Sequence, residues 1–474
     1  MKSMPRRSLR LAIIMALGAP LGGIALPAAA SGLDDYDPTF DSPIGGRLQG
    51  VARTGPQQTM GALIEDVCPA GLSRGRILDT AGGRDLADRC TDMVEAALAT
   101  GDLDAALNAM QEVAGEEVDA IATSEVDASS GQMDAIGARL QSLRSGGPRV
   151  AFALPGFEDA LAARGGAGLL SGGGASADGA QRLGVFVNGS YDYTDRDPSF
   201  NEAGFEADGY GVTAGLDYQL SDALLLGAAF SYKNTDADIA QRGGTLDTDS
   251  VGGYGYATYT IGGGWYLDAM GGYTQNDHEQ VRTLAYAVRG ATRGNVDTQQ
   301  TALSELDSDE IAGSVKLGFD AVHGAWTVSP YVRAEIAKVE IDGYTERMSR
   351  PSALGNGLAL QIDDQSFTSV MSAVGAQFGW LSTQTWGTWY PQVMAEYVHE
   401  FDNDGDPITG RFVNAPGVSF RMGIDDPDRN FANIGVASSF VLNSGTAAFV
   451  SFQTLLGYHD LTAHAVELGL RVPF

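Results

Sequence analysis

Apolar and polar residues alternate strictly at the carboxyl end of the chain. In the last nine residues the apolar positions are Val466, Leu468, Leu470, Val472 and Phe474. A period of two is typical of a strand with one apolar and one polar face. The same rhythm recurs over residues 181–474, for example at 210–220, 224–232, 311–319 and 448–454. We therefore predict a mainly β fold, a transmembrane barrel whose apolar face meets lipid and whose polar face lines a lumen.

The connections between these predicted strands alternate in length. The short ones lie at 221–222, 261–264, 321–324, 381–387 and 443–445. The long ones lie near 195–206, 234–246, 277–305, 342–364 and 402–427, and a last short one lies at 459–462. This pattern predicts an up-and-down barrel of about twelve strands, with short turns in the periplasm and long loops outside. Four tryptophans beside short turns fit a periplasmic aromatic girdle, and they are Trp265, Trp326, Trp386 and Trp389.

Residues 31–115 change to helical spacing and predict a small helical region. One short apolar face contains Leu63, Ile64 and Val67, and a second contains Leu86, Met93, Val94, Ala97 and Leu98. Gly101 is expected to end the second helix and Asp102 to cap the next one. Cys68 and Cys90 stand on the two helices, so in an exported chain we predict a structural disulfide between them. Two buried free thiols are the alternative.

Residues 116–147 predict a further helical segment, followed by a Gly-, Ala- and Ser-rich linker at 148–180. Met133, Ile136, Leu140 and Leu143 make its apolar stripe. A helix over 132–144 would be about 20 Å long, close to the roughly 25 Å apolar band of a barrel. The stripe fits either packing on other helices or a plug in the pore.

Arg139 and Arg144 are the candidate anchors of a pore helix. We hypothesise that they pair with charges that alternation places in the lumen, where an ion pair is screened less than at the surface. Those charges are Asp217, Asp268, Lys316, Arg333, Glu335, Glu467 and Arg471.

Residues 1–30 have the pattern of a secretory signal peptide. A basic start, Lys2 to Arg10, precedes an apolar stretch at 11–26 and small residues at 28–30. The Arg6–Arg7 pair would suit twin-arginine export, but that route carries folded cargo, so we expect the Sec translocon. Beyond residue 30 no apolar run reaches the roughly 18 residues of a membrane helix. The expected location is the outer membrane of a Gram-negative cell.

The chain is strongly acidic, with 60 Asp and Glu against 30 Lys and Arg and a net charge of −30. Such a chain should repel nucleic acid. Its acidic loops either keep the surface soluble or attract divalent cations at lipopolysaccharide. We expect outer-membrane lipid and lipopolysaccharide as partners, no cofactor, and a monomer.

Catalytic motifs are scarce in the sequence. Gly-x-Ser-x-Gly and His-Glu-x-x-His are missing. The pairs Asp277–His278 and His459–Asp460 are the local candidates for a loop-based hydrolase. The acidic run at 402–406 has oxygen ligands at alternate positions, but its glycine is misplaced for a calcium loop of the EF-hand type. We therefore predict no metal site and no enzymatic step, with the hydrolase as an alternative.

Three segments, together with the barrel, carry a family resemblance. They are SGQMDAIGARLQSLRSGG at 130–147, YVHEFDNDGD at 397–406 and LGLRVPF at 468–474. Over about residues 100–474 the chain resembles the translocator domain of autotransporters, the type V secretion proteins. The resemblance implies a helix in the pore and export of the upstream region. It also implies insertion by the barrel assembly machinery, with the apolar residues of 466–474, ending in Phe474, as the recognition signal.

The chain departs from this family ahead of the barrel. Only about 100 residues separate the signal peptide from the helix, and they show no repeated β-rungs. Residues 116–147 also lack an Asn-Asn junction of the kind some members use for self-cleavage. The expected function is an outer-membrane barrel that translocates or displays its own short N-terminal region. The alternatives are a porin-like barrel with a periplasmic N-terminal domain and the loop-based hydrolase.

Overall fold

Twelve strands of the described chain close into an antiparallel barrel. They are β1 (Leu183–Arg196), β2 (Phe205–Gln219), β3 (Leu224–Ile239), β4 (Gly244–Gly262), β5 (Trp265–Gly290), β6 (Gly294–Phe319), β8 (Trp326–Ile341), β12 (Gln365–Trp380), β14 (Gly387–Glu400), β17 (Asn430–Leu442), β18 (Ala447–Leu456) and β19 (Leu461–Arg471). Each strand pairs with the next, and β19 pairs with β1 to close the ring. Short strands β7 (Ala321–His323) and β13 (Ser382–Gln384) extend this pairing at two turns. The predicted fold class is confirmed.

This computed structural model describes residues 48–73, 77–115, 183–240, 243–290, 292–402, 407–443 and 447–471, with residues 121, 133, 136, 137 and 140 between them. All of them belong to one unit, 41–474. None of the described helices is long and apolar enough to span a membrane.

The two faces of the barrel wall differ as the alternation predicts. On β2, Tyr210 is 58% exposed and Val212 is 51% exposed on the outer face, whereas Asp217 is 4% exposed on the inner face. On β19, Leu468 is 58% exposed and the preceding Glu467 is 5% exposed. The outer face is therefore apolar and the inner face carries charge, as a barrel in lipid requires.

Two of the predicted long loops, 234–246 and 277–305, are wrong. Residues 234–239 and 244–246 continue β3 and β4, and only the chain between them turns. Residues 277–290 and 294–305 continue β5 and β6, whose register runs unbroken to Gly290–Gly294. The outer residues of these stretches are mostly polar or small, with acids at positions such as Asp236, Asp277 and Glu305, so they lose the apolar face of a membrane strand. The backbone ladder does not depend on that face and continues beyond it.

Two of the remaining long connections, 342–364 and 402–427, build a second, smaller sheet. Its strands are β9 (Tyr344–Thr345), β11 (Leu360–Ile362), β15 (Ile408–Phe412) and β16 (Ser419–Met422). A short strand, β10 (Arg347–Met348), pairs with β6, and a 3-10 turn, η5 (Asn356–Leu358), precedes β11.

Ahead of the barrel lie three helices, α1 (Gly55–Ser73), α2 (Ala81–Glu95) and α3 (Leu103–Val113), with turns η1 (Gln49–Val51), η2 (Ile77–Asp79) and η3 (Ala96–Thr100). Thr80 caps α2, accepting a hydrogen bond from the Gly83 amide at 2.9 Å. Gly101 ends the helical run in a left-handed conformation, φ 73°, as predicted. Asp102 stands at the start of α3, but its side chain makes no capping hydrogen bond, so that prediction is wrong.

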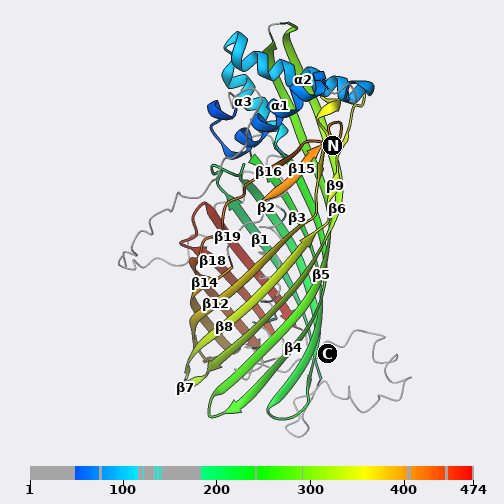
Figure 1. Cartoon of the computed structure of the whole chain (residues 1–474). Coiled ribbons are helices and arrows are strands. Elements are labelled where there is room, and N and C mark those ends of the chain that lie inside the picture. The colour runs from blue at the N-terminus through cyan, green and yellow to red at the C-terminus, as the bar shows by residue number, and fades with distance from the viewer. Residues whose placement is uncertain are drawn as a thin grey trace, which may run out of the picture. The chain divides into compact units, whose positions relative to one another are not determined.

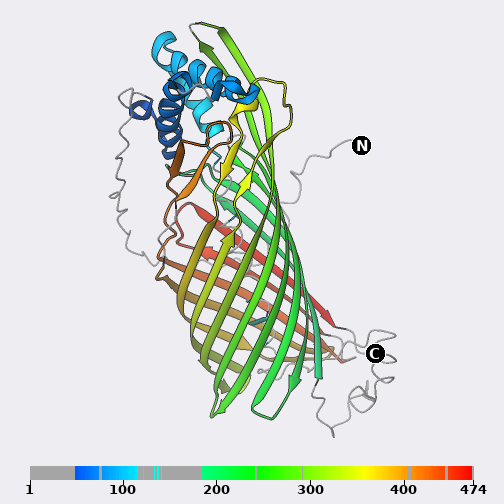
Figure 2. The same cartoon turned by 45° about the vertical axis from the view of Figure 1, so that its right-hand side comes forward.

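The long strands carry the barrel wall to these helices. In Figures 1 and 2, β5 and β6 run past the other strands and reach α1–α3. We call residues 48–115 the cap, and residues 282–302, where β5 and β6 meet it, the tip. The opposite end of the barrel has the short turns, where Trp326 stacks on Trp380 with ring centroids 5.6 Å apart.

Candidate functional site

The outer face of β5 changes character once along its length. Trp265, Leu267 and Tyr273 are exposed apolar or aromatic residues, and Asp277 and Glu279 follow on the same face. On the paired strand β6, the outer residues change from acidic to apolar at Ile311. The apolar stretch matches the roughly 9–11 residues with which a strand crosses a membrane. The wall beyond Tyr273 therefore stands outside the lipid.

The inner face of β5 changes further along. Asn276, His278 and Gln280 are buried polar residues that face their neighbours across the lumen side of the sheet. From Leu284 the inner residues become apolar, and Leu284, Tyr286 and Val288 are 0%, 5% and 3% exposed. An apolar inner face outside the membrane needs another apolar surface to cover it.

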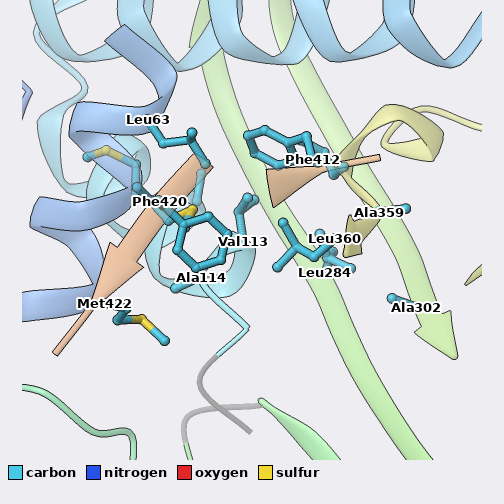
Figure 3. Close-up of a cluster of buried hydrophobic side chains, with 14 of the residues drawn as sticks. Leu63, Val113, Ala114, Leu284, Ala302, Ala359, Leu360, Phe412, Phe420 and Met422 are labelled. Atoms are coloured by element: carbon cyan, nitrogen blue, oxygen red, sulfur yellow. The ribbon is translucent and has the colours of Figure 1, made fainter. Parts of the chain in front are cut away.

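The cap covers that inner face. One cluster of buried residues joins the helices to the tip and the second sheet (Figure 3). Leu63 of α1 and Val113 of α3 lie in it beside Leu284 of β5. From the second sheet it takes Leu360, Ile362, Ile408, Phe412, Phe420 and Met422. The hydrophobic core of the cap is therefore shared with the barrel wall.

A buried ion pair lies beneath this cluster. Arg282 of β5 is 1% exposed, and its Nε and Nη2 donate to the two carboxylate oxygens of Glu346 at 2.8 and 2.6 Å. Arg282 Nη1 also donates to the Glu112 carbonyl of α3 at 2.9 Å. Glu346 in turn accepts from the Leu360 amide at 2.7 Å. Barrel wall, cap and second sheet thus meet at one guanidinium, in the bidentate geometry that makes such pairs strong.

The end of the tip is tied to the cap by polar contacts. Thr292 donates from its amide and its hydroxyl to Glu95 at 2.9 and 2.6 Å. Arg293 pairs with Asp88 at 2.5 Å and with Asp92 at 3.2 Å. The acidic end of α2 in the cap therefore binds a basic residue and a hydroxyl group at the end of the tip.

A few described residues lie in the sequence between the cap and the barrel. Ile121 is helical and belongs to the shared core of the cap. Met133, Ile136 and Leu140 are helical and at most 2% exposed, and they pack in a second cluster. Its other members face inward from β1, β3, β4, β6 and β8, and are Phe186, Leu225, Ala229, Tyr254, Tyr256, Ala312 and Ala337. Contact with five strands of one barrel places these residues inside it, which favours the pore interpretation of the stripe.

The comparisons with known proteins agree with this arrangement. The model of the family described as "Autotransporter beta-domain" matches residues 185–453, more than half of the chain. The chain belongs to the autotransporter β-domain family. It is therefore an outer-membrane barrel of the type V secretion class, as the resemblance predicted.

Among the relatives of this autotransporter chain, esterase EstA of Pseudomonas aeruginosa is 25% identical over 296 residues, covering 61% of this chain and 42% of the relative. The pertactin autotransporter of Bordetella bronchiseptica is 26% identical over 262 residues, covering 53% and 25%. The chain thus spans less than half the length of these relatives. The solved translocator domain of NalP from Neisseria meningitidis has a TM-score of 0.49 at 12% identity, covering 74% of this chain and 99% of that one. Because this TM-score is below 0.5, the barrel fold is assigned from the observed strand pairing and not from this likeness.

The lumen of this autotransporter barrel carries most of the predicted charges, and the side chain of Arg471 lies outside the described part. Lys316 Nζ lies 4.8 Å from the centroid of the Tyr331 ring. Asp217, Asp268 and Glu467 are buried on inner faces. Arg333 pairs with Glu335, and with Glu396 of β14 at 2.7 Å. Glu396 was not singled out from the sequence, although alternation along β14 places it on the inner face. Arg139 and Arg144 lie outside the described residues, so their anchoring role stays a prediction.

Other predicted site residues lie apart or beyond the described part. Cys90 is buried in α2, but the side chain of Cys68 on α1 lies outside the described part, so the disulfide stays a prediction. Of the terminal signal, Val466 and Leu468 lie in β19 and so does the backbone of Leu470. Val472, Phe474 and residues 403–406 of the acidic run lie outside the described residues.

The two candidate catalytic pairs differ in geometry. Asp277 and His278 are neighbours on a strand and therefore face opposite sides of the wall. His278 is buried and bonds to Thr248 at 2.9 Å and Ser308 at 3.0 Å. His459 Nδ1 lies 2.5 Å from Asp460, and its side chain is 82% exposed.

Burial changes the pKa of two cap carboxyls. Burial raises the pKa of Asp85, although the Gly357 amide, which donates to it at 2.8 Å, and Arg89 act the other way. Burial also raises the pKa of Asp92, against the opposing effect of Arg89 and Arg293. Both groups lie at the contact between α2 and the barrel, so docking of the cap is linked to pH.

Proposed function

We propose that this autotransporter barrel carries the cap across the outer membrane and displays it at the cell surface. The path of the chain is the observation that supports this. Ile121 lies in the cap core, and Met133, Ile136 and Leu140 pack against inward-facing residues of the barrel. Strand β1 starts at the short-turn end. A chain threaded in this way joins a region at one mouth to a barrel that begins at the other.

The orientation of the barrel follows from its connections. In outer-membrane barrels the short turns are periplasmic and the long connections face outward. The cap contacts the tip and the long connections. For example, the Gly55 amide of α1 donates to the Phe200 carbonyl at 2.7 Å. This argues against the porin-like alternative with a periplasmic N-terminal domain.

The route to the membrane is part of the proposal. Residues 1–30 would act as a signal peptide for the Sec translocon. Residues 466–474 would be read by the barrel assembly machinery. Lipid and lipopolysaccharide would surround a single barrel, since each of the twelve strands has exposed apolar residues on its outer face.

We further propose that the chain performs no enzymatic step. The relative EstA is an esterase by name, but the match to it covers less than half of that protein. Ester hydrolysis by purified protein, compared between the natural chain and His459→Ala, tests this. Turnover that disappears in the variant would favour the hydrolase instead.

Surface labelling tests the display itself. An epitope tag is inserted in the connection between α1 and α2, and a second chain carries the tag at the short turn of Ser221 and Asp222. We expect antibody to label the first tag on intact cells and the second only after the outer membrane is permeabilised. Labelling of the first tag only after permeabilisation would contradict the proposal.

A further inference from the structure

We propose that the tip and the second sheet form a built-in docking surface for the cap, which holds the cap on the barrel without a covalent connection. The exported region of this chain is thus retained by its own translocator even when the chain between them is cut. This inference rests on the proposed function only for placing the cap outside the cell. The contacts between cap and barrel would be the same on either side of the membrane.

The first argument is the composition of the shared core. The three helices have 19, 15 and 11 residues, and a helical region of this size buries little apolar surface by itself. Their most buried side chains, among them Ile64, Leu86, Met93, Leu107 and Met110, belong to one cluster with residues of the barrel. Undocking would expose both halves of that cluster to water, and the loss of this apolar burial opposes undocking.

The second argument is that the docking surface is specialised. The inner face of β5 is polar at Asn276, His278 and Gln280 and turns apolar only from Leu284, where the cap begins. A lumen wall that only lets a chain pass does not require a change from polar to apolar inner residues. The apolar inner face fits one occupant, the apolar faces of α1–α3.

The third argument is the polar contacts around the shared core. Arg282 binds the end of α3 through the Glu112 carbonyl. Thr292 and Arg293 bind the end of α2 through Glu95, Asp88 and Asp92. These contacts lie at both ends of the tip, so they fix the orientation of the cap as well as its position.

The fourth argument is a close approach of backbones. Gly357 of η5 lies against α2, and a Cβ atom at Gly357 would stand 2.3 Å from the Gly82 carbonyl oxygen and 2.3 Å from the Leu86 nitrogen. The Gly357 amide donates to Asp85 of the same helix. Only glycine allows this contact, because the neighbouring atoms belong to rigid helix backbone.

A cut chain tests retention directly. A tobacco etch virus protease site with flexible flanks is inserted between Gly115 and Glu116 of the full chain, and an epitope tag marks the cap. After protease treatment in mild detergent, size-exclusion chromatography separates the barrel from any free cap fragment. The variants are Gly357→Ala and Arg282→Met, and the matched control is Gly417→Ala, where a Cβ atom meets nothing within 4 Å.

We expect the cap of the natural chain and of Gly417→Ala to stay with the barrel, whether the site is protected or cut. In Gly357→Ala and Arg282→Met we expect the free fragment to rise roughly tenfold or more, because overpacking or an unpaired buried charge weakens a contact by at least that factor. Heat-modifiable migration on a gel shows that each barrel is folded.

Release of the cap from the natural chain would overturn the proposal, and so would retention in both variants at the level of Gly417→Ala. The retention experiment uses purified protein, so its result does not depend on whether the cap is displayed on cells. A cap that stays docked in detergent but is unlabelled on intact cells would contradict display and leave docking supported.

Discussion

At the scale of single residues, Arg282 illustrates how position decides the role of a charge. The other arginine of β5, Arg289, is exposed, whereas Arg282 is 1% exposed with four hydrogen bonds to three partners. A buried guanidinium is tolerable only when it is fully paired. Removal of either partner leaves an uncompensated charge.

Arg282→Met should therefore destabilise the docked cap by about 3–5 kcal/mol, the usual cost of breaking a buried pair. The double variant Arg282→Met with Glu346→Gln should recover part of that loss, since it removes both charges. Urea unfolding of the cap in detergent, followed by protease susceptibility, measures both values. Arg289→Met is the control and should change little. Equal losses in the single and double variants would argue against a charge effect.

The raised pKa of Asp85 predicts a pH dependence of docking. A carboxyl whose folded pKa lies above the ordinary 3.8 binds more protons in the folded state. Its stabilising contribution is complete below the unfolded pKa and is lost as pH rises through the raised value. Stability of the cap should thus fall as pH rises from the ordinary value of 3.8 through the raised pKa of Asp85. Asp85→Asn should flatten that slope while keeping an acceptor for the Gly357 amide. A steeper slope in Asp85→Asn would contradict this.

At the scale of elements, the two faces of β5 meet four environments. The outer face meets lipid up to Tyr273 and water beyond it, while the inner face meets the lumen up to Arg282 and the cap beyond it. The alternation never breaks along the strand, so a single backbone ladder continues through all four. Strand length here is set by hydrogen bonding to the neighbour and not by membrane thickness.

The pore segment carries the prediction that belongs to this scale. Arg139→Glu combined with Arg144→Glu should raise single-channel conductance in planar bilayers, because acids would then face the buried lumen acids Asp217 and Asp268. Arg289→Glu, on the exposed outer face, is the control and should leave conductance unchanged. Unchanged conductance in the double variant would rule out the anchoring role.

At the scale of the whole molecule, the shared core predicts how the protein opens. The cap and the tip form one cluster, and the lipid-facing part of β5 does not take part in it. Residues that bury a common core exchange their amide protons together. Hydrogen exchange should therefore show 284–300 losing protection together with α1–α3, at lower free energy than 265–273. Exchange of 284–300 in step with the lipid-facing strands would contradict a joint unit.

The sequence by itself determined the barrel. Alternation from residue 181 onward, with short and long connections, predicts both the fold class and the faces of residues such as Asp217 and Leu468, because a strand in lipid must separate its two sides. Helical spacing predicts α1–α3 for the same reason: each helix needs one apolar stripe.

Only the tertiary structure decided where those stripes are covered. The sequence predicted a loop over residues 277–305 because their outer positions lack the apolar residues of a lipid-facing strand. Pairing between β5 and β6 nevertheless keeps these residues extended. Leu284, Tyr286 and Val288 alternate with the smaller residues Ala285 and Ala287, and only the packing of α1–α3 on that inner face explains the larger ones. Contacts between segments far apart in the chain depend on the closed ring of strands, which brings residue 63 beside residue 284, and periodicity along the sequence does not record that closure.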